Sequence, residues 1–446
     1  MFGRWWYFAS WKPILLVSVI FSFVFYGYAD QSFEYAQNND RYLIDMLVEK
    51  GILSEQEALQ TRKNMASAPE VVFTSQKKLS IYSYTQIRYS SASQSYSESG
   101  VDGRSFSSNG ASLRRQILAF DAAITDGTRA FISINTAASN LFDSLFIQRK
   151  VETRYFDYDL TFGYMSPSFS MESPAGAKLK TPDRSILNTF WGGKDLSLSD
   201  ERSANQCFAG NHIGVFVDAC APFDEHVFWG LAVTNAKNSY WRELDEKIGL
   251  AYWASLGYAI KDGDLDFSCG VNAGYSENIA SIRTPSGREK CDCMGVCVYH
   301  LLQWGRVFFE TEFTASQTWH GKTISDTQPL YTLASGNSLP YGAMAMFGYT
   351  VYDGFWGRVE PILRYAYLDS GGAGVAENNV LYSIKSLNGL YNRVKAYYIG
   401  CNWYIDGNTL KFQLGFEHLD FEGSPTGRVE KSCSVDMGIA QFQVEF

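Results

Sequence analysis

Residues 397–417 read YYIGCNWYIDGNTLKFQLGFE and contain the pattern that recurs through most of the chain. On both sides of Asp406-Gly407, large apolar residues occupy every second position and small or polar residues occupy the positions between them. A period of two predicts β-strands with one apolar face. An Asp-Gly pair between two such runs is typical of a tight hairpin turn. The stretch therefore predicts two adjacent antiparallel strands.

The same alternation begins at Leu79 and continues to the C-terminus. Examples are DYDLTFGY at 157–164 and VFFETEF at 307–313, in which aromatic or aliphatic residues alternate with small or charged ones. Sixteen strands are predicted, at about 79–90, 111–124, 129–138, 142–149, 155–165, 211–219, 226–235, 247–260, 264–276, 294–302, 306–318, 341–351, 356–370, 394–405, 408–422 and 435–446.

The connections between these strands alternate in length. Long ones lie at 91–110, 166–210, 277–293, 319–340, 371–393 and 423–434, with a moderate one at 236–246 and an exception in the short 139–141. The intervening short ones carry Asp-Gly turn chemistry, as at Asp126-Gly127 and Asp353-Gly354. A soluble sandwich gives the same alternation within strands, but it has no reason to sort loop lengths by parity. An even-stranded, all-β antiparallel transmembrane barrel does, and sixteen strands leave room for an aqueous lumen.

Composition and the first segment indicate an exported protein. The chain has 446 residues, 16% of them aromatic, and beyond its first segment no apolar run suited to a membrane helix. Residues 1–29 read as a signal peptide cleaved at about Ala29, and the alternative is an uncleaved helical anchor. Cleavage leaves 36 basic and 47 acidic residues, a net charge of −11. So acidic a chain is a poor binder of nucleic acid.

Residues 30–78 are predicted to form a periplasmic helical segment and linker ahead of the barrel at 79–446. DRYLIDMLVEKGILSEQEALQTRKNM, at 40–65, has apolar residues at helical spacing, a stop at Gly51 and a Ser54/Glu57 capping box. We expect a short helical hairpin. It could self-associate, touch the cell wall, or serve as a plug or spacer.

The cysteines and histidines do not form a recognisable catalytic or metal motif. The eight cysteines fit disulfides or buried free thiols, and Cys291, Cys293 and Cys297 share one strand face without a histidine at matching spacing. His300 and His418 lie on predicted strands without an obvious nucleophile and orienting carboxylate. We predict no enzyme activity, no metal and no other cofactor.

The barrel segment resembles the phosphate-selective porin O and P family. The resemblance is carried in order by YSYTQIRY, SLRRQILAFDAAITDGTRAFISI, LFDSLFI, FGYMSPSFSMES, PDRSILNTF, FWGLAVTNAKN, FFETEF and VEPILRYAYLD. It implies a trimeric, sixteen-stranded bacterial outer-membrane diffusion channel with an inward-folded third loop. The longest predicted connection, 166–210, stands at the place of that loop.

Charged residues predicted to face the lumen are the candidates for the pore constriction. They are Arg88, Arg115, Asp121, Asp157, Asp159, Lys178, Lys180, Asp183, Arg184, Glu310, Glu312, Glu360 and Arg364. Phosphate binding requires an excess of cationic donors over carboxylates, and these positions carry no such excess. We therefore predict a weakly selective pore for small hydrophilic solutes or ions. The alternatives are a phosphate- or anion-selective porin, or a structural outer-membrane anchor.

Two pairs of neighbouring charged residues have more than one interpretation. Asp183-Arg184 could form part of the constriction, or could tether the loop to the wall. Arg114 and Arg115 are adjacent on a strand, so only one of them is expected to line the pore and the other to lie near a rim.

The chain ends in AQFQVEF, another alternating strand. Phe442, Val444 and the terminal Phe446 are expected to face lipid, and Gln441 and Gln443 the lumen. The terminal Phe446 resembles the signal by which bacterial outer-membrane barrels are recognised by the barrel assembly machinery. The predicted partners are that machinery, outer-membrane lipids, two further copies in a homotrimer, and small polar solutes or ions.

Overall fold

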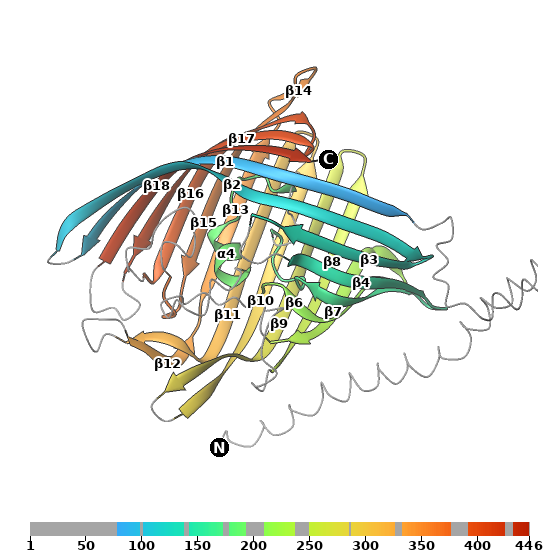
Figure 1. Cartoon of the computed structure of the whole chain (residues 1–446), viewed down its shortest axis with the longest axis horizontal. Coiled ribbons are helices and arrows are strands. Elements are labelled where there is room, and N and C mark those ends of the chain that lie inside the picture. The colour runs from blue at the N-terminus through green and yellow to red at the C-terminus, as the bar shows by residue number, and fades with distance from the viewer. Residues whose placement is uncertain are drawn as a thin grey trace, which may run out of the picture. The chain divides into compact units, whose positions relative to one another are not determined.

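The computed structural model describes residues 78–98, 101–137, 142–172, 178–192, 209–236, 249–284, 287–325, 332–375, 391–423 and 431–445. The predicted signal peptide and helical hairpin, and Phe446, lie outside these residues. The described chain is a single antiparallel sheet closed on itself, with one short helix inside it (Figure 1).

The strands and the helix follow one another along the chain. They are β1 (Leu79–Glu98), β2 (Val101–Thr125), β3 (Thr128–Asn135), β4 (Phe142–Glu152), β5 (Asp157–Met165), α4 (Ile186–Gly192), β6 (His212–Ala221), β7 (Asp224–Asn235), β8 (Leu250–Asp262), β9 (Leu265–Thr284), β10 (Gly287–Trp304), β11 (Val307–Ser325), β12 (Thr332–Ser338), β13 (Tyr341–Tyr349), β14 (Tyr352–Gly354), β15 (Gly357–Asp369), β16 (Arg393–Asp406), β17 (Leu410–Glu422) and β18 (Lys431–Glu445).

β12, β13 and β14 together occupy a single position in the barrel wall, between β11 and β15. β12 and β13 pair in turn with β11, and β13 and β14 pair in turn with β15. The interruptions fall at Pro340, which cannot donate a ladder hydrogen bond, and at 350–351. The wall therefore has sixteen positions, as the alternation in the sequence predicts, and each predicted strand overlaps an observed one.

The first and last strands close the barrel. β1 pairs with β18 over fifteen residues, from Tyr84 opposite Glu445 to Glu98 opposite Lys431. Inside this seam, the Gln86 side chain donates a 2.7 Å hydrogen bond to Gln443. Closure gives both the first and the last strand of the wall a second neighbour, so the sheet has no terminal strand.

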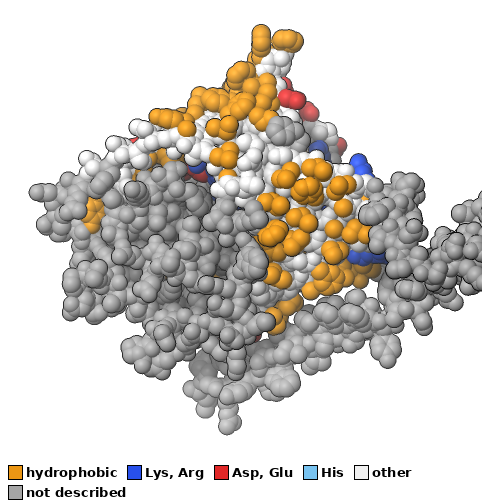
Figure 2. Space-filling model, viewed as in Figure 1, with side chains coloured by type: hydrophobic (Ala, Val, Ile, Leu, Met, Phe, Trp, Pro, Cys, Tyr) orange, Lys and Arg blue, Asp and Glu red, His pale blue; other side chains and the backbone are white. Residues whose placement is uncertain are grey.

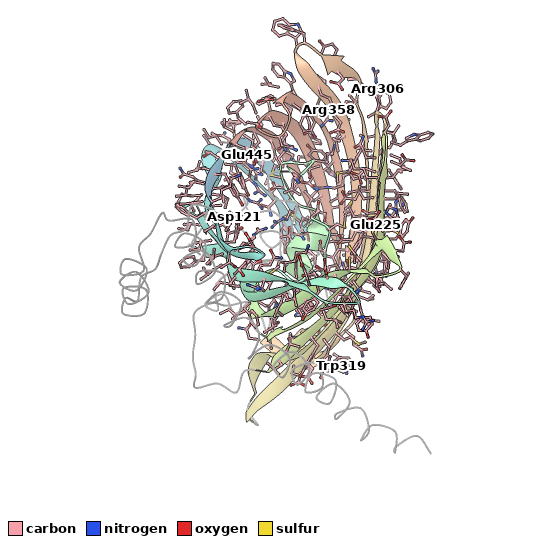
Figure 3. The ribbon with its side chains drawn as sticks, turned by 90° about the vertical axis from the view of Figure 1, so that its right-hand side faces the viewer. Asp121, Glu225, Arg306, Trp319, Arg358 and Glu445 are labelled. Atoms are coloured by element: carbon pink, nitrogen blue, oxygen red, sulfur yellow. The ribbon has the colours of Figure 1, made fainter. Side chains whose placement is uncertain are left out.

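The two rims of the barrel differ, as the loop lengths predict. Connections of two to four residues join the strands at one rim, here called the turn rim, and the opposite end is the loop rim. Figure 3 shows Arg306 and Arg358, which lie at or beside turn-rim connections, at one end and Trp319 of β11 towards the other. Three expectations were wrong: much of 91–110, of 277–293 and of 319–340 is strand, because β1–β2, β9–β10 and β11–β12 continue their ladders past the barrel wall.

Side chains separate by face, with an apolar outer surface. Outward-facing Leu231, Leu256, Val298 and Leu363 are all more than 40% exposed, and apolar groups gather on the described part of the face in Figure 2. At the C-terminus, Gln441 and Gln443 are buried inside while Phe442 is exposed, as predicted from the alternation.

The inner face is less polar than the sequence pattern suggests. Towards the loop rim, β15–β18 present large buried apolar residues to the interior, where small or charged ones were expected. These are Leu368, Val394, Leu419, Phe421, Val435 and Met437. The same apolar cluster contains Phe169, Ile186, Leu187, Phe190 and Trp191, from the connection that holds α4. Alternation predicts which residues face inwards, but it does not predict what packs against them.

Gly342 on β13 allows α4 to approach the wall. A Cβ at this position would lie 2.6 Å from the carbonyl oxygen of Tyr367 and 3.3 Å from Cγ of Leu187. Because the first contact is with backbone, the strand itself would have to shift.

We predict that Gly342→Ala lowers the free energy of unfolding by about 1–3 kcal/mol, the usual cost of overpacking. The measurement is denaturant unfolding of the refolded barrel in lipid vesicles. Gly110→Ala is the matched control, because a Cβ at Gly110 would meet no atom within 4 Å. Equal losses in the two variants would contradict the close approach of the β15 backbone and Leu187 to Gly342.

Candidate functional site

The connection between β5 and β6, residues 166–210, folds into the barrel and is called the inner loop here. Its described parts are 166–172, 178–192 and 209–210. α4 contacts β13 and β15 from inside, and Figure 1 shows it within the ring of strands. Trp191 of α4 donates a 2.8 Å hydrogen bond from Nε1 to Ser316 of β11.

Asp183 is the most strongly held carboxylate of the inner loop. Arg88 of β1 donates to both of its oxygens at 2.9 Å, and Arg114 of β2 donates to Oδ1 at 2.7 Å. Arg88 also donates to the carbonyl of Pro182 at 2.8 Å. A carboxylate bound by two guanidinium groups away from water fixes both the position and the orientation of the loop.

A β-bulge explains how Arg114 reaches this carboxylate. Between β1 and β2 the register shifts at Gln86/Ile87, so that Arg115 lies opposite Gln86, Leu113 lies opposite Ile87, and Arg114 is the extra residue. A bulge re-aims a side chain that would otherwise point to the other face. The expectation that one of Arg114 and Arg115 lies near a rim was therefore wrong, because Arg114 reaches Asp183 inside and Arg115 pairs across from the inward-facing Gln86.

Arg364 on β15 joins three parts of the interior. One guanidinium nitrogen donates to Thr181 Oγ1 at 2.8 Å and to the Asp183 carbonyl at 2.9 Å, and lies 3.5 Å from Glu172 Oε1. The other nitrogen donates to Glu417 of β17 at 2.9 Å. One buried side chain thus connects two segments of the inner loop with the wall.

Lys180 forms a third attachment. Its Nζ donates to both oxygens of Glu360 on β15 at 2.8 and 2.9 Å. The Tyr404 hydroxyl donates to the same carboxylate at 2.7 Å, and Asn402 donates to the Lys180 carbonyl at 2.7 Å. The ammonium also lies 4.5 Å from the ring centroid of Phe308.

Glu172 holds the start of α4, and Glu312 holds the earlier segment at Ser170 and Met171. Glu172 accepts from both the backbone N–H and the hydroxyl of Ser185 at 2.7 Å. Ser185 is the N-cap of α4, and its Oγ accepts from the backbone N–H of Asn188. Glu312 of β11 accepts from the backbone N–H of Met171 at 3.0 Å.

The ion pairs dominate the electrostatics of the loop. Burial alone would raise the pKa of Asp183, but Arg88 and Arg114 outweigh it and hold that pKa well below its ordinary value. The contribution of Asp183 to stability is therefore present above the ordinary carboxyl pKa of about 3.9 and is lost only as the pH falls through the lower folded-state value. Burial lowers the pKa of Lys180, and Glu360 offsets part of that effect.

The opposite wall remains open to solvent. Inward-facing Arg129, Lys150 and Asp157, near the turn rim, have side chains 45%, 51% and 50% exposed. Arg129 lies 3.4 Å from Asp121, and Lys150 lies 3.5 Å from Asp157. A hollow of about 220 Å³ is lined in part by Arg129, Lys150 and Asp159. The interior thus has one wall covered by the inner loop and one wall with hydrated charges.

The structure divides the sequence-predicted candidates into three groups. Those that hold the loop are Arg88, Lys180, Asp183, Glu312, Glu360 and Arg364. Those on the open wall are Asp121, Asp157 and Asp159, the last lying opposite Asp218 of β6. Of the rest, Arg184 donates to the Glu172 carbonyl, Glu310 is buried, Arg115 is half-buried and Lys178 is exposed.

Several residues that hold the loop were not among the candidates. They are Glu172, Asn402, Tyr404, Lys411 and Gln413, whereas Arg114 and Glu417, which also hold the loop, were expected in or near the lumen. Glu172 stands in one of the stretches that carry the family resemblance, and Glu417 and Gln413 show the inward parity. The bulge that redirects Arg114 leaves no mark in the alternation.

Other kinds of site are not found in the described part of the chain. Cys220, Cys269, Cys297 and Cys401 are free thiols, and within the described residues no group of three or more His, Cys, Asp or Glu is placed to hold a metal ion. None of the described helices is long and apolar enough to pass through a membrane.

No protein-family model and no curated protein sequence matches the chain. Solved structures with a similar fold include the anion-selective porin from Comamonas acidovorans, with 10% identity, a TM-score of 0.52, and 83% of this chain and all of that one covered. Salmonella typhi OmpF in complex with daunomycin has 12% identity and a TM-score of 0.49, covering 83% of this chain and 98% of that one. At such identities the first likeness shows a shared fold, the sixteen-stranded barrel.

We predict that Asp183→Asn destabilises the protein by about 3–5 kcal/mol, because it leaves Arg88 and Arg114 buried without their charge partner. Denaturant unfolding measures the change. The matched control is Asp121→Asn, which breaks the half-exposed pair with Arg129 and should cost less than about 1 kcal/mol. A similar small loss in both variants would show that the Asp183 attachment contributes little.

Proposed function

We propose that the protein is an outer-membrane porin, a water-filled channel for passive diffusion of small hydrophilic solutes or ions. One observation carries the proposal: charged side chains on one inner wall of a closed barrel are about half exposed, as Lys150 and Asp157 are. A barrel of sixteen strand positions is wide enough to hold an aqueous lumen, and these side chains are in contact with water at its turn-rim mouth. The inner loop narrows the lumen from the other side, as a selectivity element does.

The outer surface supports insertion in a bilayer. Tyr155, Phe223, Trp304, Phe355 and Trp356 are at or next to turn-rim connections and are 66–92% exposed. Aromatic side chains at that density fit the headgroup level, where an apolar ring and a polar group are both satisfied. Above them the outward-facing residues are mainly aliphatic and aromatic. We place the turn rim on the periplasmic side and the loop rim on the extracellular side, as in bacterial outer-membrane barrels, whose short turns face the periplasm.

The channel we propose is weakly selective. Of the cationic side chains that could form a phosphate path, Arg88, Arg114, Lys180 and Arg364 are each bound to carboxylates. Their charge is therefore largely neutralised, and an anion would have to displace a buried carboxylate to use them. Membership of the phosphate-selective porin O and P family is compatible with the inner loop, but high-affinity phosphate selectivity is not what this arrangement favours.

Assembly as a homotrimer, recognition of Phe446 by the barrel assembly machinery, a cleaved signal peptide and a periplasmic helical preface complete the proposal. These follow from the sequence and from the family resemblance. A purely structural anchor is the second candidate, but an anchor gains nothing from a hydrated inner wall.

Purified, refolded protein in a planar lipid bilayer should give stepwise increases in conductance. Heat-modifiable migration on a gel verifies that the barrel is folded before the recording. Folded protein that inserts without conductance steps would contradict the channel and favour the anchor. The reversal potential in a salt gradient then measures the sign and size of the selectivity.

Phosphate should not block chloride current at low concentration. With the Arg88 and Arg364 guanidinium groups bound to carboxylates, millimolar phosphate has few free donors to bind. We expect chloride conductance in wild-type protein to change by less than about twofold, a difference below 0.5 kcal/mol in binding terms. Strong block at low phosphate would establish the phosphate-selective alternative.

A further inference from the structure

An apolar hollow lies on the outer surface of the tall wall formed by β11 and β13–β17. It has a volume of about 470 Å³. Its lower side is a row of cross-strand neighbours, Phe309, Phe347, Leu363, Ile399 and Phe416. The next row towards the loop rim is Ala345, Tyr365, Tyr397 and His418.

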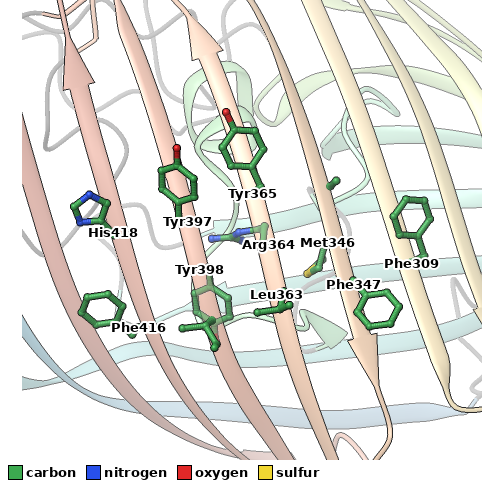
Figure 4. A pocket seen from close by; sticks show the side chains of 12 residues that line it. Phe309, Met346, Phe347, Leu363, Arg364, Tyr365, Tyr397, Tyr398, Phe416 and His418 are labelled. Carbon is green, nitrogen blue, oxygen red and sulfur yellow. The ribbon is translucent and has the colours of Figure 1, made fainter.

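Ala345 is the smallest of the side chains that line the hollow. Its neighbours Phe347 and Tyr365 are bulky and more than 40% exposed, so a depression remains between them. Figure 4 shows the hydroxyls of Tyr365 and Tyr397 pointing to the same side, next to His418. Their rings lie 5.1 Å apart, and the Tyr397 and His418 rings lie 6.2 Å apart.

The chemistry of the outer surface begins to change within this row, where His418 lies opposite Asp436 of β18 and its ring nitrogens lie 2.7 Å from Asp436 and 3.1 Å from Asp420. The next two rows contain Lys395 opposite Asp420, and Arg393 opposite Asp369 and Glu422. Lys395 lies 2.7 Å from Glu422, and Arg393 lies 3.5 Å from Asp369. On a lipid-facing wall, such a change from aromatic to charged rows marks the boundary between acyl chains and headgroups. The hollow therefore lies on the acyl-chain side of that boundary, in the extracellular leaflet of the membrane.

We propose that the Ala345 hollow is a specific binding site for a lipid of the outer leaflet. An acyl chain lies over Ala345 between the aromatic side chains, and the polar headgroup is held by the Tyr365 and Tyr397 hydroxyls and the charged rows above. This inference rests on the proposed insertion of the barrel in the outer membrane.

A second copy of the chain fits another wall better. β3 has 8 residues, and a strand of that length tilted by about 40° rises about 20 Å, less than the apolar band of ~25 Å. The short wall at β3–β5 still exposes Leu145, Ile147 and Phe162. Covering that wall with a neighbouring copy removes the mismatch and leaves the tall wall, with the hollow, to lipid.

The test is native mass spectrometry of protein extracted from outer membranes in mild detergent. We expect a retained lipid on the wild type, and roughly a tenfold lower retained fraction in Ala345→Phe, which fills the hollow. Ala273→Phe, an outward-facing exposed position on β9, is the matched control and should retain lipid as the wild type does. Tyr365→Phe combined with Tyr397→Phe tests the headgroup contact. This double variant should lower lipid retention without changing how the acyl chain fits the hollow.

Each other outcome overturns the site. Equal retention in Ala345→Phe and the wild type would mean that any bound lipid or detergent is adventitious. Dissociation of the oligomer in Ala345→Phe would assign the hollow to a second copy. Stepwise conductance of the same preparations separates the two claims, because a protein that conducts without retained lipid contradicts only the lipid site.

Discussion

The rest of the structure depends on the pairing of backbone N–H and C=O groups around a complete ring. A strand edge cannot face hydrocarbon, because each unpaired group there costs several kcal/mol. The pairing of β1 with β18 closes the wall, and it brings residues from the two ends of the barrel segment together at one seam. Arg88 and Gln441 meet at that seam, and Arg88 in turn holds Asp183 of the inner loop. Closure of the wall and placement of the loop are thus physically connected.

The inner loop is held by charge and by apolar packing together. Its carboxylates and ammonium group bind wall residues of opposite charge, and α4 packs on large apolar side chains towards the loop rim. Burying these ion pairs is expensive unless they are fully hydrogen-bonded, and Asp183 and Glu360 each have at least two donors. The consequence for function is a lumen with one packed wall and one hydrated wall. Solutes are expected to pass along the hydrated side.

Much of the barrel could be predicted from local sequence, and much of the site could not. Alternation and Asp-Gly turns are properties of neighbouring residues, so they predict the sixteen strands and the inward side of Gln441 or Glu360. The partners of Asp183 come from β1 and β2, about 95 and 69 residues away, and no local pattern encodes such a pairing. The bulge at Arg114 inverts the face that strict alternation predicts. The apolar inner residues Leu419 and Val435 were unexpected for the same reason, since the loop that covers them is distant in sequence.

The central claim is that the lumen is an open, water-filled path past the inner loop. Swelling of liposomes that contain the folded protein tests it most directly, with neutral sugars of increasing size as the external solute. The account predicts rapid swelling with the smallest sugars and a steep fall in rate as size increases, because the inner loop narrows the lumen. Folded protein that gives no swelling above protein-free liposomes, even with the smallest sugar, would contradict it.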